Sequence, residues 1–590
     1  MTHSTERRPA AQRTPRGAGR SVVVVALAAA LAVLTGCGSE NSGLAGVPTV
    51  AAEPGSGVEG VRAPSEEPGG TLRLVTGEID SLDPQRSYMP SVWNLMRLYT
   101  RTLVTYSAEP GSTDELVPDL ATDLGTGTDG GRTWTFTLRE GVRFENGRPI
   151  TSRDVKYGIQ RSFASDVVVG GPTYVVDLLD DAADPYAGPY QDETADRLGL
   201  ASIETPDDRT IVFRLTSPAP DFPFVMALPS SSPVPVESDT GGDYGARPVS
   251  SGPYLITSVD PVAGIVLSRN PEWDPATDDV RTALPDEVVV RTGLSGVARD
   301  QALLAGSADA DLSGTGVQQA TTSRLDDEDL AARIDDVTTG TVRLLALPTT
   351  VAPMDDPSCR AAVAAAVDRS AVQQALLGAG NAVRTSVLWP RAVAGAPEES
   401  DPQPDLAAAR AALAACGQPD GFSTVLAVPD VPSSVEVAEA IAADLAEVQI
   451  VVEVRPLDPA TYYATDVGNP DAVTAAGYGM VLATWTADFP TSASFLLPLV
   501  DGRSIRKVGN TNYAYLNDPT VNGLVDAARA ATEPAAAADA WRQVGYAVQE
   551  TSAYVPLVEN RVQLLAGQRL RNGVVMQPYG GYDVATAGVR

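Results

Sequence analysis

Residues 134–163, WTFTLREGVRFENGRPITSRDVKYGIQRSF, carry the most specific structural pattern in the chain. Trp134, Phe136 and Leu138 alternate with polar residues, which is typical of a strand with one buried face. The Asn-Gly pair that follows predicts a turn. Ser152 is then expected to cap a helix. The stretch therefore predicts a strand, a turn and a helix in succession.

Strand and helix patterns continue to alternate along the rest of the chain. Residues 204–215 predict a turn that leads into another strand. Asp405 is expected to cap a helix that stops at Gly417. Residues 437–448 keep helical spacing, and residues 450–454 read as a strand. Because helices and strands interleave, the fold class is α/β or α+β.

The composition of the chain excludes several classes of function. Its length of 590 residues corresponds to about three or four domains. The chain contains 43% hydrophobic and 20% charged residues, a balance typical of globular proteins. The net charge of −32 repels phosphate backbones, so we expect no nucleic-acid partner. The single histidine, His3, lies at the extreme N-terminus, which excludes catalysis by a histidine-containing triad or dyad and an HExxH zinc site.

An enzyme built from this sequence would have to work with carboxylates alone, in the manner of a glycosidase. No pair of acids stands out among the 75 Asp and Glu residues. We therefore expect no enzyme, no cofactor and no metal site.

The N-terminus predicts a signal peptide over residues 1–36. Arginines precede an apolar run at residues 22–34, which is shorter than the about 20 residues of a membrane span. The sequence LTGC at residues 34–37 resembles the lipobox of bacterial lipoproteins. That resemblance implies a diacylglycerol on Cys37 and a position on the outer face of the cell membrane. A plain secretory signal with an incidental cysteine is the alternative.

Residues 37–68 are expected to form a flexible tether between the lipid and the folded body. After the cysteine they are rich in Gly, Pro, Ser, Glu and Ala and contain no aromatic residue. Such a segment cannot bury enough apolar area to offset the entropy lost on ordering. We expect the folded body to begin near Gly70.

A series of motifs in sequence order resembles family 5 of the extracellular solute-binding proteins, the peptide and nickel type. The resemblance covers roughly residues 70–565. The motifs are LDP at 82–84, the block at 134–163, SGPY at 251–254, RNP at 269–271, CRAA at 359–362 with VDR at 367–369, WTADF at 485–489 and YVPL at 554–557.

This resemblance implies an α/β, two-lobed fold of the periplasmic-binding-protein type, type II, with an extra domain inserted in the first lobe. The expected domain boundaries follow from it. They are residues 69–96, 200–295 and 555–590 for lobe I, residues 97–199 for the inserted domain, and residues 296–554 for lobe II.

The resemblance also implies a function. Members of the family close around a ligand by hinge motion and deliver it to an ATP-driven importer. We therefore expect a monomer that captures a peptide, or a similar small solute, for the permease and ATPase of an ABC importer. An oligosaccharide or a metal chelate is the alternative ligand within the family, and a sensor or adhesin is an alternative use of the fold.

The WTADF motif implies the ligand-binding residues. In peptide-binding relatives the acid of this motif pairs with the α-ammonium group of the ligand, and Asp488 matches it. We expect Trp485 and Phe489 beside it, and Ser87 and Tyr88 of an early loop, to contact the ligand as well. The alternatives are that Asp488 only caps a turn and that Trp485 only fills the core.

Cys359 and Cys416 are the cysteines that remain after Cys37. Their even number and an oxidising exterior predict a disulfide between them. Two buried free cysteines are the alternative.

Overall fold

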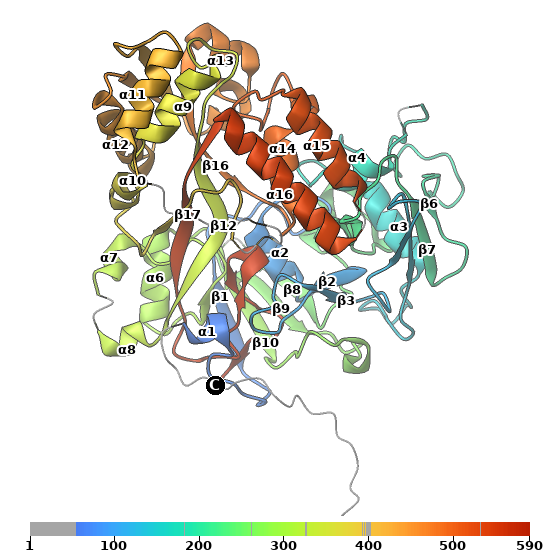
Figure 1. The fold of residues 1–590 in the computed structure, drawn as a ribbon. Helices are drawn as coiled ribbons and strands as arrows, with labels where there is room; N and C mark the ends of the chain where they lie inside the picture. The colour runs from blue at the N-terminus through green and yellow to red at the C-terminus, as the bar shows by residue number, and fades with distance from the viewer. Residues whose placement is uncertain are drawn as a thin grey trace, which may run out of the picture. The chain divides into compact units, whose positions relative to one another are not determined.

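The computed structural model describes residues 55–590 except 182, 261, 325–326, 392, 394–395, 397–402 and 532. The predicted signal peptide and Cys37 lie outside the described residues. Two large β-sheets and a smaller one organise the described chain, with helices packed around them (Figure 1). Within this described part, no helix is both long and apolar enough to cross a membrane.

The first large sheet begins with the strand that opens the body. In β1 the side chains of Leu72 and Leu74 are buried whereas Arg73 is exposed, the alternation of a strand with one core face. β1 runs parallel to both of its neighbours, β10 and β11. The strand order is β11 (Ala310–Asp311), β1 (Thr71–Val75), β10 (Glu287–Arg291), β9 (Gly264–Arg269) and β8 (Tyr254–Asp260).

The second large sheet separates two hydrophobic clusters. Val342 and Leu344 of β12 pack in one cluster, whereas Leu345, which points to the opposite face, packs in the other. The strand order is β13 (Ala382–Arg384), β17 (Tyr554–Leu565), β12 (Ile334–Ala346), β16 (Tyr478–Thr486), β14 (Ser423–Pro429) and β15 (Val451–Leu457).

Each of these two clusters includes side chains from its own group of helices, and Figure 1 shows the two groups apart. The first group holds α14 (Ser492–Val500), α15 (Pro519–Ala530) and α16 (Pro534–Thr551). The second holds α9 (Pro357–Ala366), α10 (Arg369–Ala375), α11 (Leu406–Ala415) and α12 (Pro432–Ala446). Cys359 of α9 and Cys416, directly after α11, form a disulfide with their Cα atoms 5.5 Å apart.

The quoted block folds largely as its pattern predicts. Residues 133–137 form β5 and residues 152–161 form α3 (Ser152–Arg161). The cap differs from the expected one, because Thr151 precedes the helix and its backbone N–H donates to Asp154 Oδ2 at 2.8 Å. Ser152 is not the cap, since its hydroxyl donates to the carbonyl of Asp207.

Strand pairing draws the domain boundaries differently from the expected ones. β11 pairs with β1, so residues 310–311 join the first sheet and not lobe II. β17 pairs with β12 and β13, so residues 555–565 join the second sheet and not lobe I. β6 (Ile203–Glu204) and β7 (Thr210–Arg214) complete the small sheet with β5 (Thr133–Thr137) and β4 (Thr126–Thr128), beyond residue 199. These pairings join segments that are distant in sequence, which local patterns do not reveal.

The predicted tether is wrong for the part of it that the structure describes. Residues 56–59 form the short helix α1 (Ser56–Glu59), and the backbone N–H of Gly57 donates to Asp335 Oδ1 at 2.9 Å. Arg62 forms a buried ion pair with Asp335 at 2.8 Å. The prediction weighed only apolar burial, whereas this segment is held to the body by a buried charge pair.

Candidate functional site

Asp488 lies between β16 and α14, where segments from three parts of the chain meet. The hydroxyl of Tyr88 donates to Asp488 Oδ2 at 2.6 Å, and the hydroxyl of Tyr174 donates to the same oxygen. Tyr88 precedes α2 (Pro90–Met96), and Tyr174 is the first residue of α4 (Tyr174–Leu179). One carboxylate oxygen therefore joins three segments that no local motif links.

The environment of Asp488 perturbs the acid and both phenols. Burial raises the pKa of Asp488, and the hydrogen bonds from Tyr174 and Tyr88 lower it. Burial and the nearby Asp488 charge also raise the pKa of both tyrosines, so each phenol keeps its proton and acts as a donor. A carboxylate offers about four acceptor positions, so Asp488 has capacity for a further donor from a ligand.

Aromatic rings surround this carboxylate. Phe489 is buried, and its ring stacks on Phe224 at 5.9 Å and meets Tyr174 edge-on at 5.3 Å. Tyr88 stacks on Trp93 at 5.7 Å between ring centroids. These contacts hold the rings in fixed orientations and form a wall that a ligand can pack against.

The structure treats the other two expected ligand contacts differently. Ser87 is fully buried and its hydroxyl donates to Asp80 Oδ1 at 2.9 Å, so it positions the early loop and does not face a ligand. The indole N–H of Trp485 donates to the carbonyl of Phe495 at 2.9 Å, and its ring packs partly in the core. The structure thus brings together Tyr88, Asp488 and Phe489 of the expected set.

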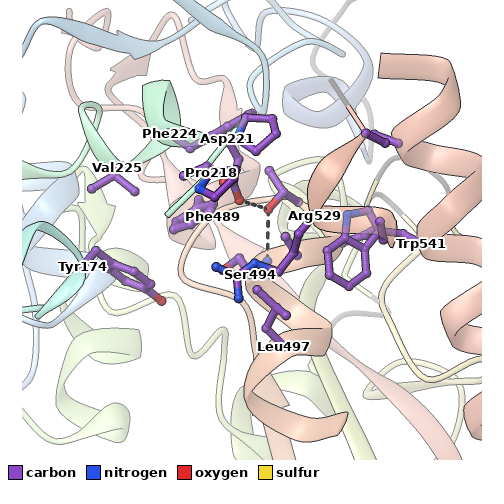
Figure 2. A pocket seen from close by; sticks show the side chains of 18 of the residues that line it. Tyr174, Pro218, Asp221, Phe224, Val225, Phe489, Ser494, Leu497, Arg529 and Trp541 are labelled. Carbon is purple, nitrogen blue, oxygen red and sulfur yellow. Dashed lines mark hydrogen bonds between the residues drawn. The ribbon is translucent and has the colours of Figure 1, made fainter. Parts of the chain in front are cut away.

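A cavity of about 430 Å³ opens beside Phe489 (Figure 2). Pockets that bury one small ligand measure about 300–1,000 Å³. Figure 2 shows Tyr174 at one side of this cavity and Trp541 at the other. Its walls come from α4, α5 (Phe222–Val225), α14, α15 and α16. A second hollow, of about 60 Å³, is lined by Asp488 and shares Phe489 and Pro490 with the first cavity.

The sequence interpretation did not identify four residues of this site: Tyr174, Asp221, Arg529 and Trp541. Each comes from a segment without a recognised motif, and only the packing of the chain brings them together. Among the described residues, no group of three or more His, Cys, Asp or Glu side chains could hold a metal ion. Aromatic walls, hydrogen-bond acceptors and a few charges suit the reversible binding of a small solute.

Residues 115–506 match the profile described as "Bacterial extracellular solute-binding proteins, family 5 Middle". The chain is 24% identical to the probable ABC transporter periplasmic-binding protein SapA of Escherichia coli, over 88% of this chain and 91% of SapA. It is 26% identical to heme-binding protein A of Haemophilus influenzae, over 80% and 84% of the two chains.

A solved structure, clavulanic acid biosynthesis oligopeptide binding protein 2, superposes with a TM-score of 0.87 and is 43% identical. The match covers 92% of this chain and 99% of the other. The predicted α/β fold of the periplasmic-binding-protein type is confirmed by this likeness.

Proposed function

This chain belongs to family 5 of the bacterial extracellular solute-binding proteins, and we propose that it captures peptides, or a similar small solute, for an ABC importer. The observation that carries the proposal is the convergence of Tyr88, Tyr174 and Asp488 beside a cavity of ligand size. The similar solved structure, which is named an oligopeptide binding protein, supports peptides as the ligand class. The similarity to SapA, which is named a probable ABC transporter protein, supports delivery to a permease and an ATPase.

Asp488 is the proposed partner of a positive group of the ligand. A carboxylate in a cleft with little water makes a short, charge-assisted bond to an ammonium group. Tyr88 and Tyr174 hold the carboxylate in place before the ligand arrives, so less ordering accompanies binding. Truncating one partner of such a buried pair costs about 2–5 kcal/mol. Contacts that only the ligand supplies would stabilise the closed arrangement of the two lobes.

The proposed setting is the outer face of the cell membrane, with a lipid on Cys37 and the protein as a monomer. The disulfide between Cys359 and Cys416 is consistent with an oxidising compartment. The role is binding and not catalysis. With His3 as the single histidine, catalysis would have to rely on carboxylates, and relatives of this chain are named as binding proteins.

A metal chelate is the second candidate ligand. The similarity to a protein named heme-binding, and the aromatic rings of Phe224, Phe489 and Trp541 around the cavity, favour it. A flat, largely apolar chelate could stack on these rings.

The proposal is tested by calorimetry with a pool of peptides and the same pool after N-acetylation. Wild type is expected to bind the free pool and to bind the acetylated pool at least about tenfold more weakly. Asp488→Asn should reduce that difference, whereas Asp539→Asn, an exposed charge change on α16, should leave it unchanged. If wild type binds neither pool, the proposal of peptide capture is wrong and a metal chelate becomes the favoured ligand. If it binds both equally, the role of Asp488 fails.

A further inference from the structure

Two opposite charges line the cavity of about 430 Å³. The carboxylate of Asp221 accepts a hydrogen bond from the Thr491 hydroxyl at 3.3 Å, and the guanidinium of Arg529 donates to the Ser217 hydroxyl at 3.3 Å. Neither charge has an ion-pair partner within 4.0 Å among the residues that the structure describes. Asp177, the other charged residue of the lining, is exposed and accepts a hydrogen bond from Thr173.

The surroundings of Asp221 hold its carboxylate in place at the cavity wall. Burial raises the pKa of Asp221, while the Thr491 hydroxyl and the nearby Arg529 charge lower it. Thr491 also accepts the backbone N–H of Ser494 at 3.1 Å, which fixes the Asp221 carboxylate relative to the start of α14. Figure 2 shows these two hydrogen bonds meeting at one oxygen atom beside Asp221 and Ser494. Asp221 is therefore a positioned carboxylate with one weak neutral donor.

Apolar side chains form most of the remaining wall. Phe224 and Phe489 stack on each other, and Trp541 is 6% exposed. Leu497 of α14 also lines the cavity. Burial of an apolar ligand side chain against these surfaces stabilises the complex. The cavity thus combines a partly buried carboxylate, a guanidinium group and an apolar surface, with the second carboxylate of the lining, that of Asp177, exposed.

We propose that this cavity binds a short zwitterionic peptide with an apolar side chain, its ammonium group on Asp221 and its carboxylate on Arg529. The inference rests on the proposed function, since it names the ligand class for the same cleft. In this proposal, Asp221 binds the ammonium group of peptides that are short enough to lie inside the cavity. Asp488, which lines the smaller hollow, remains the proposed anchor for longer peptides.

A zwitterion fits this cavity better than a neutral or singly charged ligand. A ligand that expels water from Asp221 and Arg529 without replacing their contacts leaves two charges unpaired in an apolar surrounding, which is costly. A ligand with one charge leaves one of them unpaired. A zwitterion pairs with both groups at once. An unmodified peptide is such a ligand, because its free ends are an ammonium group and a carboxylate.

The test uses the dipeptide Ala-Phe, its N-acetylated form and its C-terminal amide, each titrated calorimetrically into the intact protein. Wild type is expected to bind the free dipeptide at least about tenfold more tightly than either blocked form. Asp221→Asn should lose the discrimination against the acetylated form and keep that against the amide. Arg529→Gln should show the opposite pattern.

Two matched controls lie on α16 outside the cavity lining. Asp539 and Arg542 form an ion pair in which Asp539 is exposed and Arg542 is half-buried, and Asp539→Asn and Arg542→Gln make the same charge changes. Both should bind all three ligands as wild type does. Asn at position 221 can still accept the Thr491 hydrogen bond, and the blocked ligands test wild type without any substitution.

Three results would overturn the inference. Wild type could bind the three dipeptide forms equally, or it could bind none of them while it binds longer peptides. The third is that Asp488→Asn, and not Asp221→Asn, removes the discrimination against N-acetylation. Each leaves peptide capture standing, whereas failure of wild type to bind any peptide overturns the proposed function as well.

Discussion

The hydroxyl of Tyr88 donates a 2.6 Å hydrogen bond to Oδ2 of Asp488, although 400 positions separate the two residues. Tyr174, from a third segment, donates to the same oxygen. Movement of these segments away from Asp488 would break both bonds and uncover a partly buried carboxylate. Binding of a cationic group and the contact among the three segments are therefore linked at one oxygen atom.

Removing the Tyr174 hydroxyl should shift the pH dependence of peptide binding upward. The phenol stabilises the charged form of Asp488 and so lowers its pKa, against the raising effect of burial. Tyr174→Phe therefore raises the pKa of Asp488 further, and a higher pH is needed before the carboxylate can pair with an ammonium group. We expect the midpoint of peptide affinity against pH to lie higher in Tyr174→Phe than in wild type.

The measurement is peptide affinity from pH 4 to pH 8 for wild type, Tyr174→Phe and Tyr546→Phe. Tyr546 is exposed on α16 and serves as the control. An unchanged or lower midpoint in Tyr174→Phe would refute the electrostatic coupling of this phenol to Asp488.

Asp444 on α12 should make the protein less stable as the pH rises toward neutral. Burial raises the pKa of Asp444 to about 6, although the backbone N–H of Asp368 donates to it. The folded state then holds a proton that the unfolded state has released. This contribution to stability is fully present below about pH 3.8 and is lost as the pH rises through about 6.

Asp444→Asn should therefore raise the free energy of unfolding at pH 7.5 by about 1–2 kcal/mol, allowing for the partial exposure of the group. The gain should vanish at pH 3.5. Urea unfolding at both pH values checks this, with Glu439→Gln on an exposed position of the same helix as the control. A gain of equal size at both pH values would contradict the titration of Asp444 as its source.

The bond between Cys359 and Cys416 should leave no free thiol in the mature, denatured protein without reductant. It closes a sequence separation of 57 residues, which corresponds to about 4 kcal/mol of stabilisation in the chain-entropy model. Replacing both cysteines by serine should lower the free energy of unfolding by roughly that amount. Two thiols per denatured molecule in a titration would count against the pairing.

Cys37→Ala should release the protein from the membrane fraction. A diacylglycerol supplies two acyl chains, which is enough for stable anchoring, and the variant lacks the thiol that would carry them. Fractionation of cells that express wild type and variant measures this. Equal retention of both proteins in the membrane would rule out Cys37 as the anchor.

The parts of the fold that could be predicted from the sequence are those that local patterns specify. Alternation of apolar residues located β5, and Asp405 caps α11 as its position predicts, with its side chain accepting the N–H groups of Ala407 and Ala408. The domain boundaries were less accurate, because β11 and β17 join their sheets through partners hundreds of residues away.

The site divides in the same way. A family motif pointed to Asp488 and Phe489, whereas Tyr174, Asp221 and Arg529 stand in segments without such a motif. Their roles depend on which segments pack together, and a single sequence carries no direct record of that. Ser87 illustrates the reverse error, since it lies in the right loop but its side chain points into the protein.

Peptide capture is tested most directly by mass spectrometry of the small molecules released from protein that has been purified gently and then denatured. We expect wild type to release short peptides with free amino and carboxyl ends and at least one apolar side chain. These peptides should be absent from an Asp221→Asn, Asp488→Asn double variant purified in parallel. Release of an oligosaccharide or a metal chelate in place of peptides would contradict peptide capture.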